Sequence, residues 1–135
     1  MCLFAHVAAG AIAGALSPTP LAASLLGLAS HVALDVVPHR DIDRMRYEIL
    51  LAALAIAAIA LGGALSLNVT LGIAFAIAPD GENLLWKLGR IRDDQKIFPG
   101  HRRFLPHGMV TGRGSIVLQV AGSAAVIAFL IRRGV

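Results

Sequence analysis

Charged residues are scarce in this sequence. Only 15% of its 135 residues are Asp, Glu, Lys or Arg, whereas a soluble domain carries about 25%. The stretches 1–34, 49–79 and 114–131 hold no charged residue and together make up 83 residues. Apolar runs of this length are too long for the core of a small soluble protein and match bilayer spans. The sequence therefore predicts a multi-pass membrane protein and excludes a soluble enzyme and a disordered chain.

Cysteine is scarcer still. Cys2 is the single cysteine, so no internal disulfide can form and a disulfide-stapled secreted domain is excluded. A cleaved signal peptide over residues 1–23 is a minor alternative, because no basic segment precedes the apolar run. The net charge of +4 is explained by Lys and Arg in cytoplasmic loops beside anionic lipid head groups. The expected partner is therefore the lipid bilayer, and no specific nucleic acid is expected.

Proline and glycine divide the apolar runs into helices. Residues 17–20 (Ser-Pro-Thr-Pro) interrupt the first run and predict a helical hairpin over 3–37. Gly62-Gly63 and Ser66 predict the turn of a second hairpin over 47–79. The expected fold is all-α, a polytopic membrane bundle of four to five short transmembrane helices in one integral-membrane domain, 1–135. The predicted helices are 3–17, 21–37, 47–64, 67–79 and 114–131.

The first predicted helix also contains Gly10-x-x-x-Gly14, a small-residue pattern that lets helices approach closely. In the connection 80–113, Asp80 is expected to cap a short amphipathic helix with Leu84 and Leu88 on its apolar face, lying in the membrane interface.

The positive charges predict an orientation. Ten of the twelve Lys and Arg fall in the connections 38–47 and 80–113, whereas Arg132 and Arg133 follow the last helix. The positive-inside rule then places the N-terminus and both connections on the cytoplasmic side of a bacterial inner membrane.

Three ionisable residues lie inside the apolar runs. His6, His31 and Asp35 are costly to bury in a membrane and are therefore candidates for function. His31 and Asp35 are spaced i and i+4, so they project from one helix face. His6 and His31 lie equally far from the turn centre between Pro18 and Thr19, so an antiparallel hairpin brings them level.

Imidazole and carboxylate are ligands for a divalent transition metal, and the sequence predicts zinc, with manganese as the other option. A second hairpin that turns near residue 67 brings Asp80 to the same depth as His6 and His31. Structural roles are the alternative. His6 would then lie among the lipid head groups, Asp35 would pair with Arg40, and Asp80 would cap a helix. The candidate ligands are His6, His31, Asp35, His39, Asp80, His101 and His107.

Three segments carry a resemblance to a known family. They are residues 30–39 (Ser-His-Val-Ala-Leu-Asp-Val-Val-Pro-His), 79–82 (Pro-Asp-Gly-Glu) and 101–107 (His-Arg-Arg-Phe-Leu-Pro-His). Together they resemble the uncharacterised bacterial membrane-bound metal-dependent hydrolase family, and the His-x-x-x-Asp helix is similar to one in zinc-dependent phospholipase C-like proteins. The resemblance implies metal binding and hydrolysis. Glu82 stands where the family has a second aspartate, and the His-x-x-x-Asp segment precedes the other two instead of following them.

The expected function is therefore a metal-dependent hydrolase at the cytoplasmic interface, acting on a phosphoester or a lipid head group. Asp41 or Glu82 is the expected general base, and Arg102 and Arg103 are expected to hold an anionic phosphoester. The alternative is a non-enzymatic multi-pass membrane protein, structural, oligomeric or associated with transport, whose polar residues pair across a homo-oligomer.

Overall fold

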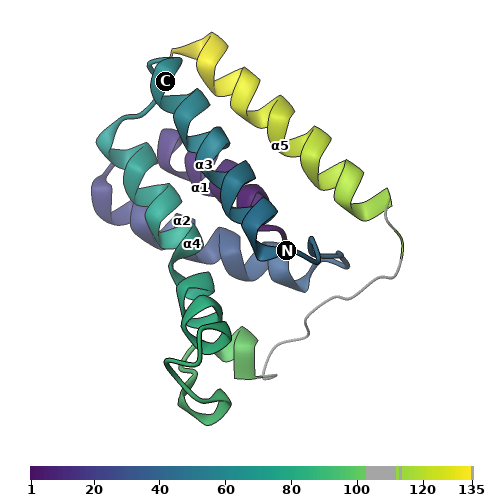
Figure 1. Cartoon of the computed structure of the whole chain (residues 1–135). Coiled ribbons are helices and arrows are strands. Elements are labelled where there is room, and N and C mark those ends of the chain that lie inside the picture. Colours follow the sequence, from purple (N-terminus) through teal and green to yellow (C-terminus); the bar gives the residue numbers. More distant parts are fainter. Residues whose placement is uncertain (103–111, 113, 135) are drawn as a thin grey trace.

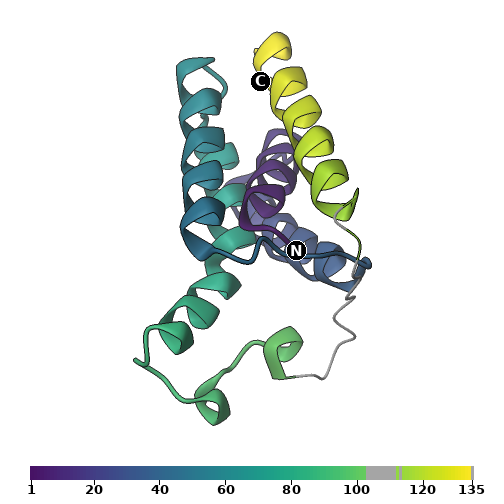
Figure 2. The same ribbon diagram turned by 45° about the vertical axis from the view of Figure 1, so that its right-hand side comes forward.

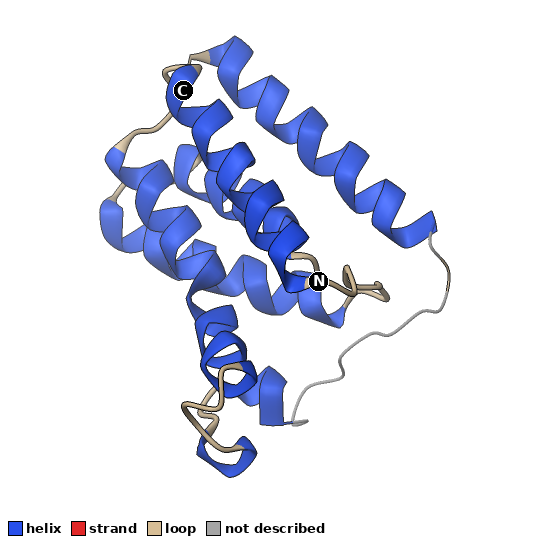
Figure 3. Ribbon diagram, viewed as in Figure 1, coloured by secondary structure: helices blue, strands red, loops and turns tan. Residues whose placement is uncertain are grey.

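The regular structure is helical throughout the described part of the chain. The computed structural model describes residues 1–102, 112 and 114–134 (Figure 1), and Figure 3 shows helices and loops but no strand in these residues. The predicted all-α class is confirmed. The helices are α1 Leu3–Ala15, α2 Pro20–Val36, α3 Met45–Leu61, α4 Leu67–Lys87 and α5 Gly114–Arg133, with 3-10 turns at Asp93–Gln95 and Pro99–Arg102.

Both predicted hairpin turns form where the sequence places them. Thr19 caps α2 by accepting a hydrogen bond from the Ala22 N–H (3.2 Å), with Pro20 at the first helical position. Ser66 caps α4 in the same way, accepting from the Val69 N–H (3.3 Å). Gly63, in the α3–α4 turn, has a φ of +74°, a conformation that glycine adopts without steric cost.

One helix boundary was predicted wrongly. α4 does not end before Asp80 but runs through Pro79 to Lys87, so Asp80 is not a helix cap and the predicted amphipathic helix is the second half of α4. Pro79 removes only the N–H that the Phe75 carbonyl would accept from, and a helix can bend at that point instead of ending. Figure 1 shows α4 changing direction near its middle.

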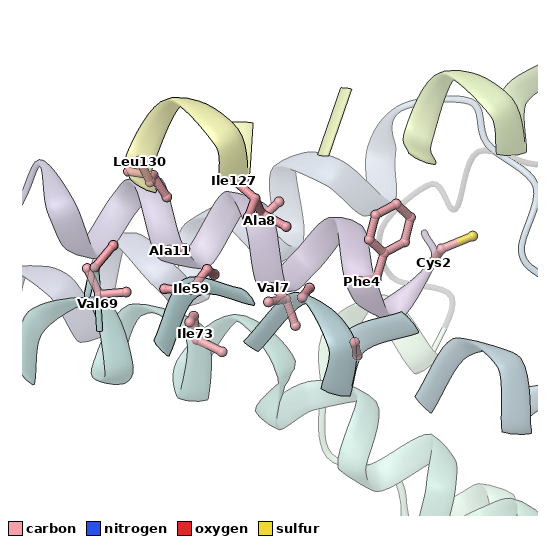
Figure 4. Packing of buried hydrophobic residues seen from close by; sticks show 13 residues of the cluster. Cys2, Phe4, Val7, Ala8, Ala11, Ile59, Val69, Ile73, Ile127 and Leu130 are labelled. Carbon is pink, nitrogen blue, oxygen red and sulfur yellow. The ribbon is translucent and has the colours of Figure 1, made fainter. Parts of the chain in front are cut away.

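α1 is the central helix of the bundle. It packs against α2, α3, α4 and α5, and Figure 2 shows α3 and α5 on either side of it. Its apolar side chains meet those of the surrounding helices in one cluster (Figure 4), in which Val7 and Ala11 lie among Ile59, Ile73 and Leu130.

Glycines let α1, α2 and α4 approach at backbone distance. A Cβ added to Gly10 would lie 2.9 Å from the Gly72 carbonyl carbon, and one added to Gly27 would lie 3.0 Å from Gly72 Cα. A Cβ added to Gly14 would lie 2.6 Å from Val69 Cα. The predicted close approach at Gly10 and Gly14 is therefore confirmed, with α4 as the partner.

Large apolar side chains lie on the outside of the molecule. Eight of the sixteen buried hydrophobic residues are alanines and one is a leucine, Leu130, whereas thirteen leucines are exposed in the described part of the chain. By length and apolar composition, α5 is the one described helix that could cross a membrane, and most of its surface is exposed.

The helix ends gather into two groups. At one end, Asn68 Nδ2 donates to the Ser17 carbonyl (2.9 Å), which joins the two hairpin turns. At the other end, Gln119 of α5 accepts from the Cys2 N–H and donates to the Arg40 carbonyl, both at 2.9 Å. The start of α1, the segment after α2 and the start of α5 therefore meet, and the candidate site lies at this end.

Candidate metal centre

The glycine contacts set the register of the site residues. His6 lies one helical turn before Gly10, and His31 lies one turn after Gly27. Because the helices touch at these glycines, the two imidazoles come level and stack, with ring centroids 4.1 Å apart and planes 21° apart. The predicted alignment of His6 and His31 across the hairpin is confirmed.

Asp35 lies against both imidazoles, and Asp80 completes the cluster. Asp35 Oδ1 is 3.3 Å from His6 Nε2, and Asp35 Oδ2 is 3.2 Å from His31 Nε2. Asp80 Oδ2, from α4, is 3.9 Å from His6 Nε2. Both histidine side chains are fully buried, and the Asp35 side chain is 8% exposed. The structure thus brings together four of the predicted ligands from three helices. His101 is a fifth, since one ligand atom each of His31, Asp35 and His101 lies within 4.8 Å of the other two.

The tautomer of His31 is fixed by a backbone carbonyl. His31 Nδ1 lies 2.7 Å from the Ala76 carbonyl oxygen of α4. A carbonyl can only accept, so Nδ1 carries the proton and Nε2 of the neutral ring presents its lone pair to Asp35. A histidine that donates through one nitrogen and presents the other is the usual arrangement of a metal ligand.

Two hydrogen-bond acceptors that face each other repel unless a cation or a proton lies between them. Among the described residues, His6 Nε2, His31 Nε2 and Asp80 Oδ2 are buried and make no hydrogen bond. A tetrahedral zinc ion with bonds of about 2.0–2.1 Å to nitrogen and oxygen holds its ligand atoms about 3.3–3.4 Å apart. The separations of 3.3 and 3.2 Å are close to that edge length but involve different oxygens of Asp35, Oδ1 and Oδ2. One ligand atom each of His6, His31 and Asp80 lies within 4.8 Å of the other two, so these side chains would draw closer around an ion. These residues therefore fit a divalent ion.

His39 and Asp41 form a pair beside this cluster. His39 Nδ1 donates to the Val37 carbonyl (2.7 Å), and its Nε2 lies 3.5 Å from Asp41 Oδ1. The α-ammonium of Met1 forms ion pairs with Asp35 Oδ1 (2.8 Å) and Asp41 Oδ1 (3.4 Å), so it places one positive charge between these two carboxylates. The Asp41 side chain is half exposed, at 51%.

Glu82 and His101 make a second polar unit, which adjoins the cluster at His31 and Asp35. The Glu82 carboxylate accepts from the backbone N–H groups of Ile97 and Phe98 and from His101 Nδ1 (3.0 Å). Burial raises the pKa of the Glu82 carboxyl, but these donors outweigh that effect and hold the pKa below its ordinary value. His101 Nε2 pairs with the Asn83 amide (2.8 Å), and its ring centroid lies 6.2 Å from that of His31.

Arg102, the one predicted arginine that the structure describes, bonds to a loop residue outside the cluster. Arg102 is exposed, and its guanidinium donates to the Asp94 carbonyl (3.1 Å) in the loop after α4. Arg103 and His107, also predicted site residues, lie outside the described residues.

A cavity of about 400 Å³ opens beside the cluster, between α3 and α4. Asp35, Asp41 and Asp80 line it, together with Glu48 and Lys87, which the sequence reasoning missed. The reasoning also missed the Ala76 carbonyl, Asn83 and Phe98, whose ring edge packs on His31. The spacing of residues 76, 80, 83 and 87 would have indicated one helix face, but only if the helix had been continued through Pro79.

Comparison of the chain with protein-family models, with curated protein sequences and with solved structures finds no match. The resemblance to membrane-bound metal-dependent hydrolases therefore stays a prediction from three short segments.

Proposed function

We propose that this chain is a multi-pass membrane protein. The support is the distribution of side chains: alanine and glycine fill the helix contacts, and leucine covers the outside. In lipid, small residues drive close helix packing, and large apolar side chains face the acyl chains at no cost. Exposed apolar side chains in such number are typical of a surface that contacts a membrane or a partner. The bilayer of a bacterial inner membrane, with the site end toward the cytoplasm, is the proposed location.

The proposed activity is metal-dependent hydrolysis at the membrane interface, of a phosphoester or another ester in a lipid head group. The observation that carries it is the cluster of two buried imidazoles in contact with two carboxylates. His6, His31, Asp35 and Asp80 are the proposed ligands, and zinc or manganese is the proposed ion. Asp35 and Asp80 also line the cavity, so a substrate in the cavity would lie against the metal site.

The residues around the site have different proposed roles in this reaction. A divalent ion, when bound, lowers the pKa of a coordinated water toward about 7. The Ala76 carbonyl holds the His31 ring in the tautomer that offers Nε2. Asp41 is half exposed and lines the cavity, which suits a general base that takes a proton from water. Glu82 already accepts three hydrogen bonds, which suits positioning of His101 better than proton transfer. Arg102 and Arg103 as phosphate-binding residues stay a prediction.

Metal analysis of the detergent-purified protein tests the proposal. We expect near-stoichiometric zinc or manganese, and we expect a chelator to abolish hydrolysis of a chromogenic ester or phosphoester until metal is returned. His31→Ala and Asp35→Ala should each remove most of the metal affinity, and the double variant should lose little more, because ligands of one ion are not additive. Affinity should fall on acidification near pH ~6.5, since a protonated imidazole has no lone pair to donate.

Asp43→Ala is the control, because the Asp43 side chain is 81% exposed and pairs with Arg40. Additive and pH-insensitive losses, or full metal retention in Asp35→Asn, would contradict the site. A stable protein without metal would favour the non-enzymatic alternative, in which the cluster only joins three helices.

A further inference from the structure

The cavity beside the candidate metal site has two chemically different walls. One wall is apolar. Met45 and Ile49 of α3 and Ile77 and Leu84 of α4 line it, each pair spaced so that both side chains lie on one helix face. Leu3 of α1 lines the end of the cavity. Its volume, about 400 Å³, lies in the range of about 300–1,000 Å³ found for pockets that hold small organic ligands. An apolar wall of this size suits a hydrocarbon chain better than a water-soluble ester.

The apolar wall continues onto the outer surface. Ile49 is 46% exposed and Leu84 is 36% exposed, so both line the cavity and also face outward. Their neighbours Leu50 and Leu85 are exposed as well. A chain that leaves the bilayer can therefore enter the cavity without first crossing a polar surface.

The other wall is rich in carboxylates. Beyond the two proposed metal ligands, Asp41 and Glu48 line the cavity. The positive groups among its lining residues are Lys87 and the α-ammonium of Met1, which pairs with Asp35 and Asp41. The Glu48 side chain is held in place because it accepts a hydrogen bond from the Ile42 N–H (2.9 Å). The four lining carboxylates balance Lys87, the Met1 α-ammonium and a divalent ion, so the cavity offers no surplus of positive charge to an anion. An anionic group placed here would therefore lose its hydration without compensation, which disfavours its binding.

We propose that this cavity binds the hydrocarbon chain of a lipid-like amphiphile whose polar end carries no net negative charge. This inference rests on the proposed hydrolase function, for which it names the substrate class. The chain would lie between α3 and α4, and the polar end would lie between the metal cluster and Glu48. An amphiphile ending in a phosphomonoester is the class that the carboxylates exclude.

Gly81 provides a way to fill the cavity without disturbing the fold. It lines the cavity from α4, and a Cβ added to it meets no heavy atom within 4 Å. Gly81→Leu should therefore grow into the cavity, whereas Gly81→Ala, the matched control, should leave most of it open. Ile77→Phe is a second filling variant, built from a different position of the same wall.

The probes are two photoactivatable amphiphiles with the same dodecyl chain and a diazirine in that chain. One has an uncharged sugar head and the other a phosphomonoester head. After irradiation in lipid nanodiscs, mass spectrometry locates cross-links on α3 and α4 around the cavity and on the exposed face of α5. The α5 cross-links report contact with bulk lipid and serve as the internal standard.

We expect the sugar-headed probe to label the cavity, and Gly81→Leu and Ile77→Phe to reduce that labelling by about tenfold or more relative to α5. Gly81→Ala should keep it. The phosphate-headed probe should label the cavity less, and Glu48→Gln should raise its share, whereas Asp43→Asn, on an exposed side chain, should not.

Equal cavity labelling by both probes would overturn the charge preference, and labelling unchanged by both filling variants would overturn the chain site. Metal content is measured on the same samples. Metal retained in Gly81→Leu with cavity labelling lost supports the inference, and a metal-free wild type with normal cavity labelling would reject the hydrolase function alone.

Discussion

At the scale of single residues, Cys2 shows that the bundle is closely packed at the end that holds the candidate site. Its side chain is fully buried, and its Sγ lies 3.6 Å from the Arg40 carbonyl. Burial raises the pKa of the Cys2 thiol to about 11, and the carboxylates of Glu48 and Asp41 add to the effect. A pKa raised by about two units leaves roughly one hundredth of the usual thiolate at neutral pH.

We expect maleimide to label Cys2 very slowly in the folded protein at pH 7.5 and quickly after unfolding in SDS. A cysteine placed at the exposed position Gln95 in a Cys2→Ser background gives the reference rate; folded Cys2 reacting as fast as that reference would refute the burial.

At the scale of helices, the contact of α4 with α1 and α2 is what brings the ligands together. Gly72 lies at the centre of this contact, and a Cβ added there would lie 2.8 Å from Gly14 N and 2.9 Å from Gly14 Cα. Because these are backbone atoms, the helices must separate, and Gly72→Ala should lower the free energy of unfolding by about 1–3 kcal/mol. The separation should also reduce metal affinity, since His31 and Asp80 depend on the same register.

Gly122→Ala in α5 is the matched control. A Cβ added there meets nothing within 4 Å, so helix propensity alone should stabilise the protein by up to ~1 kcal/mol. Thermal unfolding in detergent measures both, and equal effects of the two substitutions would contradict the close contact.

At the scale of the whole molecule, the grouping of helix ends shows which segments the topology prediction places on the same side of the membrane. The turn after α3 and the end of α5 meet, since a Cβ on Gly62 would touch Ile131, and both lie away from the metal cluster. The positive-inside rule then predicts the site end in the cytoplasm, with the turn after α3 outside. In intact cells carrying Cys2→Ser, an impermeant thiol reagent should label a cysteine at Leu61, which is 91% exposed, and should not label one at Gln95 until the membrane is opened. The reverse pattern would invert the orientation.

Several features of this protein follow from the sequence by itself. The turns at residues 17–20 and 62–66 are fixed by proline, glycine and capping hydroxyls, which act over a few residues and need no tertiary partner. Once the first turn is placed, the equal spacing of His6 and His31 from its centre sets their register in any antiparallel hairpin. The i, i+4 spacing then puts Asp35 on the same face, which is why three members of the cluster were predictable.

Tertiary structure decided the rest. Whether a helix ends or bends at Pro79 depends on the contacts on both sides of the proline. Here the buried face of α4 reaches Pro79, and beyond it Glu82 and Asn83 bond to His101. That choice places Ala76, Asp80 and Asn83 on one side, so that α4 supplies a carbonyl to His31 and a carboxylate to the cluster. The cavity and the Glu82–His101 pair join segments far apart in the chain, and no local spacing encodes such contacts because they arise only when the helices pack.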